Sequence, residues 1–416
     1  MKRLIYEFTE SVRMAWTQIR ANKMRSVLTA LGVVIGIVAV TLMGAAIGGI
    51  NIGFQNSLAM LGSDVLYVQK WPWGPVEDWW NYANRPQMNL RSVDTVNRII
   101  SQTPNSLLDV AIPVTGRGAT VKVGDARVSG VYTIGTVADY ARFTGADYRE
   151  GRLFNDAEST AGAAVCVLGC DVADALFPHG SSLEQTVYVD GHPFRVVGVF
   201  AKQGEFLGIF SFDNQAVLPL TAFAKYFGMR QNAEIRVKVK DKTRMDDAKE
   251  ELIGAMRRAR GQVPGERDNF SVNQSEAIRA QIDPLIAGIA LAGFIVTGLS
   301  LFVGAIGIMN ITFVSVKERT KEIGTRKALG ARRRTILLQF LIEAVSICLI
   351  GGLVGTGLAY LMFMGIRGAA PNLPVELSPM LILVSMALSV MTGILSGFVP
   401  AFGASRLDPV VALRYE

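Results

Sequence analysis

The chain has 416 residues, of which 50% are hydrophobic, and it carries a formal net charge of +7. Its mean hydropathy of +0.32 excludes an ordinary soluble protein. The basic residues gather beside long apolar runs, which indicates membrane topology and gives no reason to expect nucleic-acid binding.

The first 25 residues predict an amphipathic helix. One helical face carries the apolar side chains Leu4, Ile5, Phe8, Val12, Ala15, Trp16 and Ile19. Such a helix suits the cytoplasmic headgroup layer of a membrane. A soluble helix that packs on another part of the protein is the alternative.

Four apolar runs predict four transmembrane helices, because each exceeds the roughly 20 residues that a bilayer requires. They are assigned to residues 26–50, 284–316, 335–366 and 377–405. The first run is too long for the ~7–15-residue apolar core of a signal peptide. Small residues spaced by four predict close helix packing in three runs, unless chance placed them there: Gly32, Gly36, Gly351, Gly355, Gly393 and Gly397.

The distribution of Lys and Arg predicts the orientation. Residues 1–25, 317–334 and 406–416 together hold sixteen basic and six acidic residues. Residues 51–283 hold 25 basic and 27 acidic residues, and the short loop 367–376 is neutral. We therefore expect a protein of the cytoplasmic (inner) membrane, with both termini in the cytoplasm and residues 51–283 outside.

The external segment predicts an α+β domain in which two β-α-β units flank an insertion. Residues 63–70, 91–104 and 107–116 suggest strand, helix and strand, and residues 233–241, 244–261 and 269–274 repeat this order. The insertion, at about 117–220, is rich in hairpins, with turns at Gly124-Asp125 and Asp190-Gly191. The predicted fold is thus an α-helical membrane protein with four transmembrane helices and a large extracytoplasmic α+β domain, a split βαβ unit with a β-rich insertion.

A tryptophan-rich segment, WPWGPVEDWWNY, follows the first predicted strand. Its four tryptophans are candidates for contact with an external ligand, a partner or the outer headgroup layer of the membrane: Trp71, Trp73, Trp79 and Trp80. The alternative is a loop that folds back onto its own domain.

The sequence holds no constellation of residues that points to an enzyme. It has no GxxxxGK[ST] phosphate loop, no GxSxG motif and no His or Cys cluster at metal-ligand spacing. We expect no catalytic, cofactor or metal residues in this chain. Cys166 and Cys170 are expected to be free, buried thiols. Glu343 is a candidate functional acid within a span, or a partner of an arginine near the membrane surface.

Four stretches resemble permeases of the MacB family, also called type VII ABC transporters, which include LolC, LolE and FtsX. They are RANKMRSVLTALGVVIGIVAV at the first span, EGRLFNDAESTAGAAVCVLGCDVADALF with VYVDGHPFRVVGVF outside, KERTKEIGTRKALGARRRTILLQFLIEA, and the closing ASRLDPVVALRYE. The resemblance covers nearly the whole chain. The Trp-rich segment is not recognised as a feature of the family.

The resemblance implies a porter-like outer domain and a permease that works as a dimer, either with an identical copy or with a paralogue. It implies a cytoplasmic ABC ATPase, which binds ATP and Mg, and mechanotransmission that drives export or extraction from the periplasm or outer leaflet. Further implied partners are membrane lipid and, in some systems, a periplasmic membrane-fusion adaptor. Because the chain starts 25 residues before its first span, we expect a separate ATPase subunit. An FtsX-like scaffold that activates a cell-wall hydrolase is the alternative.

The basic loop 317–334 is the predicted site of coupling to the ATPase. Glu322 and Arg326 are spaced to form a helical ion pair, and we expect Gly324 and Gly330 to interrupt the helix. The residues expected nearest the ATPase are Glu318, Arg319, Glu322, Ile323, Arg326, Lys327, Gly330 and Arg332.

Overall fold

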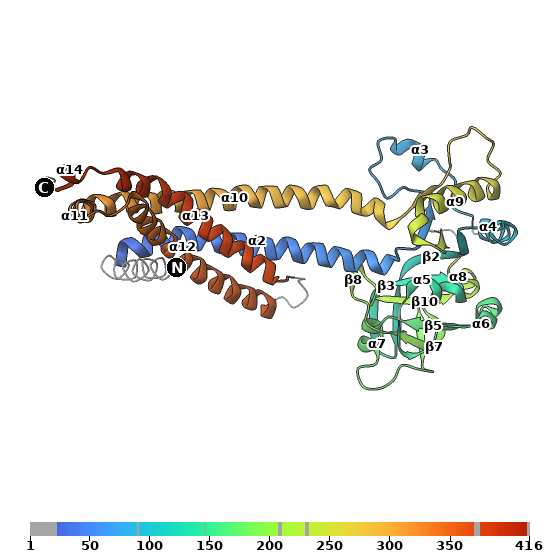
Figure 1. The fold of residues 1–416 in the computed structure, drawn as a ribbon. Coiled ribbons are helices and arrows are strands. Elements are labelled where there is room, and N and C mark those ends of the chain that lie inside the picture. The colour runs from blue at the N-terminus through green and yellow to red at the C-terminus, as the bar shows by residue number, and fades with distance from the viewer. Residues whose placement is uncertain are drawn as a thin grey trace. The chain divides into compact units, whose positions relative to one another are not determined.

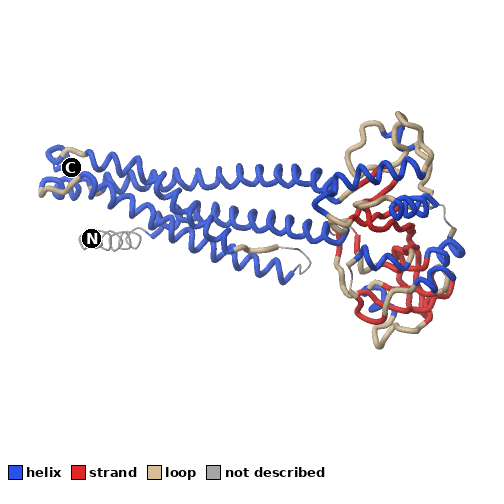
Figure 2. Tube along the Cα trace, turned by 45° about the vertical axis from the view of Figure 1, so that its right-hand side comes forward, coloured by secondary structure: helices blue, strands red, loops and turns tan. Residues whose placement is uncertain are grey.

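The computed structural model describes residues 23–89, 91–145, 147–206, 210–228, 233–369 and 375–413. The chain forms two compact units, one of Met1–Ile52 with Pro284–Glu416 and one of Gly53–Asp283. Figure 1 gives the element labels, and Figure 2 shows that the strands belong to the second unit. Residues 1–22 of the predicted amphipathic helix lie outside the described residues.

Four described helices are long and apolar enough to cross a membrane. They are α2 (Lys23–Leu61), α10 (Ser275–Glu318), α12 (Arg333–Ala369) and α13 (Pro379–Arg406). The predicted membrane architecture is therefore confirmed. Helix α2 extends beyond the predicted span 26–50 to Leu61, because the run without charged residues continues past residue 50. Helix α10 begins nine residues before the predicted span 284–316, because the polar residues 275–283 also sustain helical hydrogen bonding.

Two short helices complete the membrane unit: α11 (Thr320–Ala328) and α14 (Pro409–Leu413). Helix α11 runs straight through Gly324, so the prediction that this glycine interrupts the helix is wrong. Gly324 is buried, and a Cβ added there would lie 2.8 Å from the Cβ of Ala412 in α14. A small residue is needed here for close helix packing. Gly330 lies just beyond α11 with φ of +94°, a conformation that favours glycine at a helix end.

The glycines predicted to pack helices lie at helix contacts in all cases where the structure gives neighbours. Added Cβ atoms at Gly32 and Gly36 would meet Gly304 and Leu301 of α10 at 3.0 and 2.7 Å. Those at Gly393 and Gly397 would approach α12 to 2.8 and 2.6 Å. Gly351 and Gly355 are buried in α12, and Gly355 faces Val34 and Ile37 of α2.

The core sheet of the outer domain interleaves the two β-α-β units. Its strands β1 (Val65–Gln69), β2 (Leu108–Val123), β11 (Glu234–Val239) and β12 (Ser271–Asn273) lie in the order β12-β1-β11-β2. Strand β1 pairs antiparallel with both β11 and β12. Each unit thus encloses one strand of the other, which confirms the predicted split βαβ fold. The helices α4 (Arg91–Gln102) and α9 (Met245–Ala259) pack on this sheet through one apolar cluster.

The insertion is a ring of six paired strands, joined to the core sheet by the long strand β2. The first part of β2 pairs with β11, and the part from Thr115 onward pairs with β3. Pairing then runs through β10, β5, β7 and β6 and returns to β2. The strands are β3 (Ala126–Thr136), β5 (Val165–Leu168), β6 (Thr186–Val189), β7 (His192–Phe200) and β10 (Gln215–Pro219).

Shorter elements complete the outer domain. They are α3 (Trp79–Ala83), α5 (Ala141–Thr144), β4 (Tyr148–Gly151), α6 (Asp156–Ala161), α7 (Cys170–Leu176), β8 (Glu205–Phe206), β9 (Phe210–Ser211), α8 (Leu220–Phe227) and the 3-10 turns Ala138–Tyr140 and Lys242–Arg244. Because Ala222 and Phe223 of α8 belong to the same apolar cluster as the ring, the insertion extends to Phe227.

Candidate functional site

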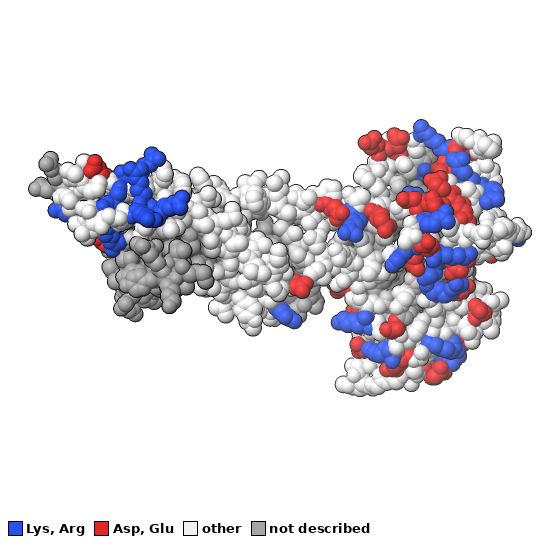
Figure 3. All heavy atoms as spheres, in the orientation of Figure 1, with Lys and Arg blue, Asp and Glu red and all other residues white. Residues whose placement is uncertain are grey.

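The α11 region lies where α10 ends and α12 begins. Thr320 and Ile323 are buried on the inner face of α11, where Ile323 joins an apolar cluster with residues of α10, α12 and α13. The opposite face is exposed, and Figure 3 shows that basic side chains gather at the end of the membrane unit that carries α11. Helix α11 thus has one packed face and one free face.

Arg319 joins α11 to α12. Its guanidinium donates to both carboxylate oxygens of Glu322, at 2.8 and 3.1 Å, and to Glu343 of α12 at 3.4 Å. The side chains of Arg319 and Glu343 are only 13% and 12% exposed. Burial disfavours the charge on Arg319, but the bonds to Glu322 and the field of Glu343 raise its pKa overall. Glu343 therefore lies in an ion pair about three turns into α12.

Arg326 adds a second link between the same helices. It donates to Glu322 at 2.7 Å, so the predicted i,i+4 pair is present, and to Gln339 of α12 at 2.6 Å. The hydrogen bond from Arg319 and the nearby charges lower the pKa of Glu322. Gln339 was not singled out in the sequence, because no local spacing relates it to Arg326.

Lys327 links α11 to the end of α13. Its ammonium donates to the carbonyls of Ser405 and Leu407, at 3.0 and 2.5 Å. A cation at this position satisfies carbonyls that the helix leaves unpaired and interacts favourably with its dipole. Burial and the nearby Arg333 lower the pKa of Lys327.

The exposed residues that follow α11 and those of α14 include large apolar side chains as well as a basic one. Leu329 is 89% exposed, and Val410 and Val411 of α14 are 62% and 63% exposed. Gly330 and Arg332 are exposed beside them. We call these five residues the exposed tip. Leu329 was not among the residues predicted from the sequence, although it is the one leucine in the basic loop 317–334. The nearness of α14 could come only from the fold.

The eight residues predicted to couple to the ATPase therefore divide into two groups. Arg319, Ile323 and Lys327 point into the membrane unit and hold α11 in place. Glu318, Glu322, Gly330 and Arg332 are exposed, and Arg326 is half-buried.

The four tryptophans of the Trp-rich segment differ in how far they are buried. Trp73 packs on Tyr67 with 4.8 Å between ring centroids and donates to Gln69, so it is part of the domain's own packing. Trp71 is half-buried, whereas Trp79 and Trp80 are 53% and 74% exposed.

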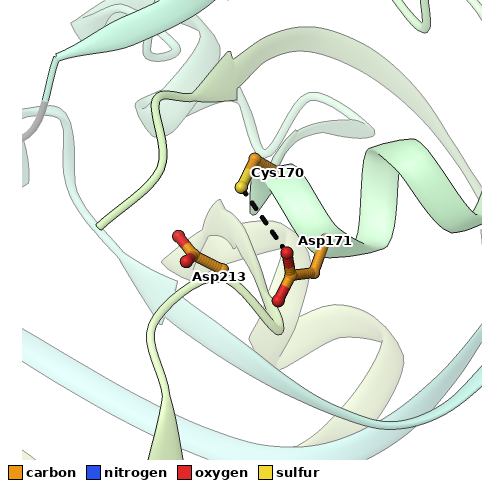
Figure 4. Close-up of side chains that lie close together, drawn as sticks. All are labelled: Cys170, Asp171 and Asp213. Carbon is orange, nitrogen blue, oxygen red and sulfur yellow. Dashed lines mark hydrogen bonds between the residues drawn. The ribbon is translucent and has the colours of Figure 1, made fainter. Parts of the chain in front are cut away.

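A third cluster, in the insertion, brings together Cys170, Asp171 and Asp213 (Figure 4). Both oxygens of Asp213 accept backbone N–H groups, from Gln203 at 2.7 Å and Gly204 at 2.8 Å. Burial and the two carboxylates raise the pKa of Cys170 to about 12, which favours the protonated thiol. These contacts fit a structural role. Cys166 and Cys170 are free and buried, as predicted.

Four membrane-length helices, an outer domain of interleaved βαβ units and a basic helical turn define a multi-pass membrane permease with a large periplasmic domain. The chain belongs to the MacB-type permease family. Residues 26–255 match the model of the MacB-like periplasmic core domain, and residues 294–409 match that of the FtsX-like permease C-terminal region.

Similar proteins include export permeases. The macrolide export ATP-binding/permease protein MacB of Neisseria meningitidis serogroup A is 32% identical over 416 residues, which cover 99% of this chain and 61% of that protein. The pyoverdine export ATP-binding/permease protein PvdT of Pseudomonas fluorescens is 31% identical over 420 residues, with 99% and 60% covered. The chain thus spans about three fifths of the length of these relatives.

Among solved structures, the periplasmic region of MacB from Actinobacillus actinomycetemcomitans is 19% identical, with a TM-score of 0.43. The match covers 54% of this chain and 95% of that structure.

Proposed function

We propose that this chain is the membrane permease of an ABC-type export machine. ATP binding and hydrolysis on an ATPase at its cytoplasmic face would move its periplasmic domain, and this movement would drive export or extraction of a substrate from the periplasm or outer leaflet. Membership of the MacB-type family supports the proposal, as do the export functions in the names of its relatives. The printed residues contain no phosphate loop, so the ATPase activity is assigned to a partner, which we expect to be a separate subunit.

In this proposal the α11 region faces the cytoplasm, and both termini lie on the same side. The basic residues of the 317–334 loop support this orientation, because positive loops stay inside.

The observation that carries the proposal is the attachment of α11 to two membrane helices. Arg319 and Arg326 bind Glu343 and Gln339 of α12, and Lys327 binds the end of α13. A displacement of α11 by a bound ATPase would therefore move α12 and α13 with it, whereas a loosely attached loop would absorb the displacement. We assign Arg319, Arg326 and Lys327 to this attachment rather than to contact with the ATPase.

The exposed tip is the surface that we assign to the ATPase. Leu329 and Val411 would enter an apolar groove, and Arg332 would pair with carboxylates of the ATPase. Burying a leucine and a valine side chain contributes roughly 1.5–3 kcal/mol each. Two such anchors are enough to decide whether the complex survives purification.

The double substitution Leu329→Asp with Val411→Asp tests this surface. It should reduce co-purification of the ATPase with the tagged chain by at least about tenfold, because two carboxylates would be buried without partners. Val263→Asp, at an exposed valine of the outer domain, is the matched control and should change nothing. Retention of the ATPase at the wild-type level by the double variant would refute the docking assignment.

Further partners belong to the same proposal: a second permease copy or a paralogue, membrane lipid and a periplasmic adaptor. Purification from native membranes, followed by identification of the proteins that come along, separates export from the FtsX-like alternative. An adaptor supports export, whereas a cell-wall hydrolase supports the signalling scaffold.

A further inference from the structure

The segment between β1 and α4 of the outer domain carries a group of aromatic side chains, of which two are exposed and two half-buried. We call Trp71, Trp79, Trp80 and Tyr82 the aromatic patch. The rings of Trp79 and Trp80 meet edge to face with centroids 5.0 Å apart. Trp71 lies 6.2 Å from Trp79 and stacks on Tyr82 at 6.1 Å. The four rings therefore form one contiguous surface.

Hydrogen bonds hold the base of this segment in place. Lys70 donates to the carbonyl of Ala83 at 2.9 Å, which closes the loop. Arg85 donates to the carbonyl of Lys70 at 3.1 Å and to Ser271 of β12 at 2.7 Å. Asn273 donates to the carbonyl of Trp71 at 2.9 Å. The two ends of the segment that carries the patch are thus held against the domain, which lowers the entropic cost of ordering the loop on binding.

Two exposed carboxylates, Glu77 and Asp78, lie beside the patch. The cations of Lys70 and Arg85 flank the same segment, but both are bound to backbone carbonyls. The guanidinium of Arg85 already lies over the ring of Tyr82, 4.2 Å from its centroid. The faces of aromatic rings attract cations, tryptophan most strongly. Trp79 and Trp80 offer such faces to the solvent, with two carboxylates next to them in the chain.

The size of the patch favours a small molecule over a folded partner. At 53% and 74% exposure, Trp79 and Trp80 present on the order of 300 Å² of surface, given 150–250 Å² for a whole aromatic side chain. A stable protein interface buries about 800 Å² on each partner. An organic cation with an apolar ring or chain would be covered well by the exposed area.

We propose that the aromatic patch is a binding site for amphiphilic organic cations, such as quaternary ammonium compounds with an aromatic or alkyl group. Trp79 and Trp80 contact the cationic head and its apolar bulk, and Glu77 and Asp78 supply the opposite charge. This inference does not depend on the ATPase, because binding to the patch requires no nucleotide.

The test uses the full-length chain in nanodiscs, with empty nanodiscs as the blank. Binding of benzyltrimethylammonium is measured by equilibrium dialysis and compared with that of neutral benzyl alcohol. We expect saturable binding of the cation at least about fivefold tighter than that of the alcohol. Trp79→Ala with Trp80→Ala should weaken cation binding at least about tenfold, and Glu77→Gln with Asp78→Asn about threefold.

The matched control is Asp246→Asn with Glu250→Gln, which neutralises two exposed acids of α9 and should leave binding unchanged. Three results would each overturn the proposal: no saturable binding of the cation, equal binding of the alcohol, or unchanged binding in the Trp79→Ala, Trp80→Ala variant.

Discussion

The ion pair between Arg319 and Glu343 gives a quantitative test of how α11 is attached. Arg319→Met keeps an apolar side chain of similar length but removes the guanidinium from Glu343. Removing one partner of a buried pair costs about 3–5 kcal/mol. Because the two side chains are 13% and 12% exposed and 3.4 Å apart, we expect the lower end, about 3 kcal/mol. Glu343→Leu should cost less, since Arg319 stays paired with Glu322.

This asymmetry predicts the outcome of a double-mutant cycle. In the variant Arg319→Met with Glu343→Leu no charge is left buried at this position, so stability should return to within about 1 kcal/mol of wild type. At 2–4 °C per kcal/mol, Arg319→Met should lower the melting temperature of the membrane unit by about 6–12 °C. Arg333→Met, at an exposed arginine, is the control.

The assay measures the reaction of the Cys348 thiol with a thiol-reactive dye during heating. Cys348 is fully buried in α12, so it reacts only when the membrane unit unfolds. A background of Cys166→Ala with Cys170→Ala confines thiol-reactive dye to the membrane unit, because the chain has three cysteines. Strict additivity of the two single changes would show that the charges do not interact and would refute the reasoning.

Two further predictions concern packing and pH. Gly324→Ala should destabilise the contact of α11 with α14 by about 1–2 kcal/mol, because overpacking outweighs the gain in helix propensity, and Ala412→Gly should rescue it. Trypsin cleavage at Arg406 reports this; equal cleavage in wild type and Gly324→Ala would contradict it. The Arg152 guanidinium, with a backbone N–H of Asn155, lowers the pKa of Glu158 to about 2. A carboxyl whose pKa is lower in the folded state stabilises the fold fully at pH values above its unfolded pKa of about 4.3. This contribution is lost as the pH falls toward 2. Glu158→Gln should therefore destabilise the outer domain at pH 6 and have little effect near pH 2, measured by tryptophan fluorescence on heating; a pH-independent effect would contradict it.

Features that depend on local pattern could be predicted from the sequence. Long apolar runs, with Glu343 as their one charged residue, marked the four membrane helices. A short apolar run marked β1, and alternating residues marked β11. The i,i+4 spacing of Glu322 and Arg326 also gave their ion pair. These features follow from helix and strand geometry alone.

Contacts between distant residues could not be predicted in this way. The carbonyls of Ser405 and Leu407 lie 78 and 80 residues after Lys327 in the chain, so nothing local shows that this lysine points inward. Glycine destabilises helix interiors, so the sequence suggested a helix break at Gly324. In the fold Gly324 instead allows α11 to pack closely against Ala412 of α14. The direction of each basic side chain was therefore decided by the packing of α12, α13 and α14.

The central claim is that nucleotide acting through α11 moves the outer domain relative to the membrane helices. Spin labels at Glu250→Cys in α9 and Arg367→Cys in α12 measure this directly by pulsed electron resonance, since both positions are exposed. With the ATPase bound, a non-hydrolysable ATP analogue should shift the distance distribution in the wild-type background. The shift should be absent with Leu329→Asp and Val411→Asp. An unchanged distribution when the ATPase and the analogue are both bound would contradict the account.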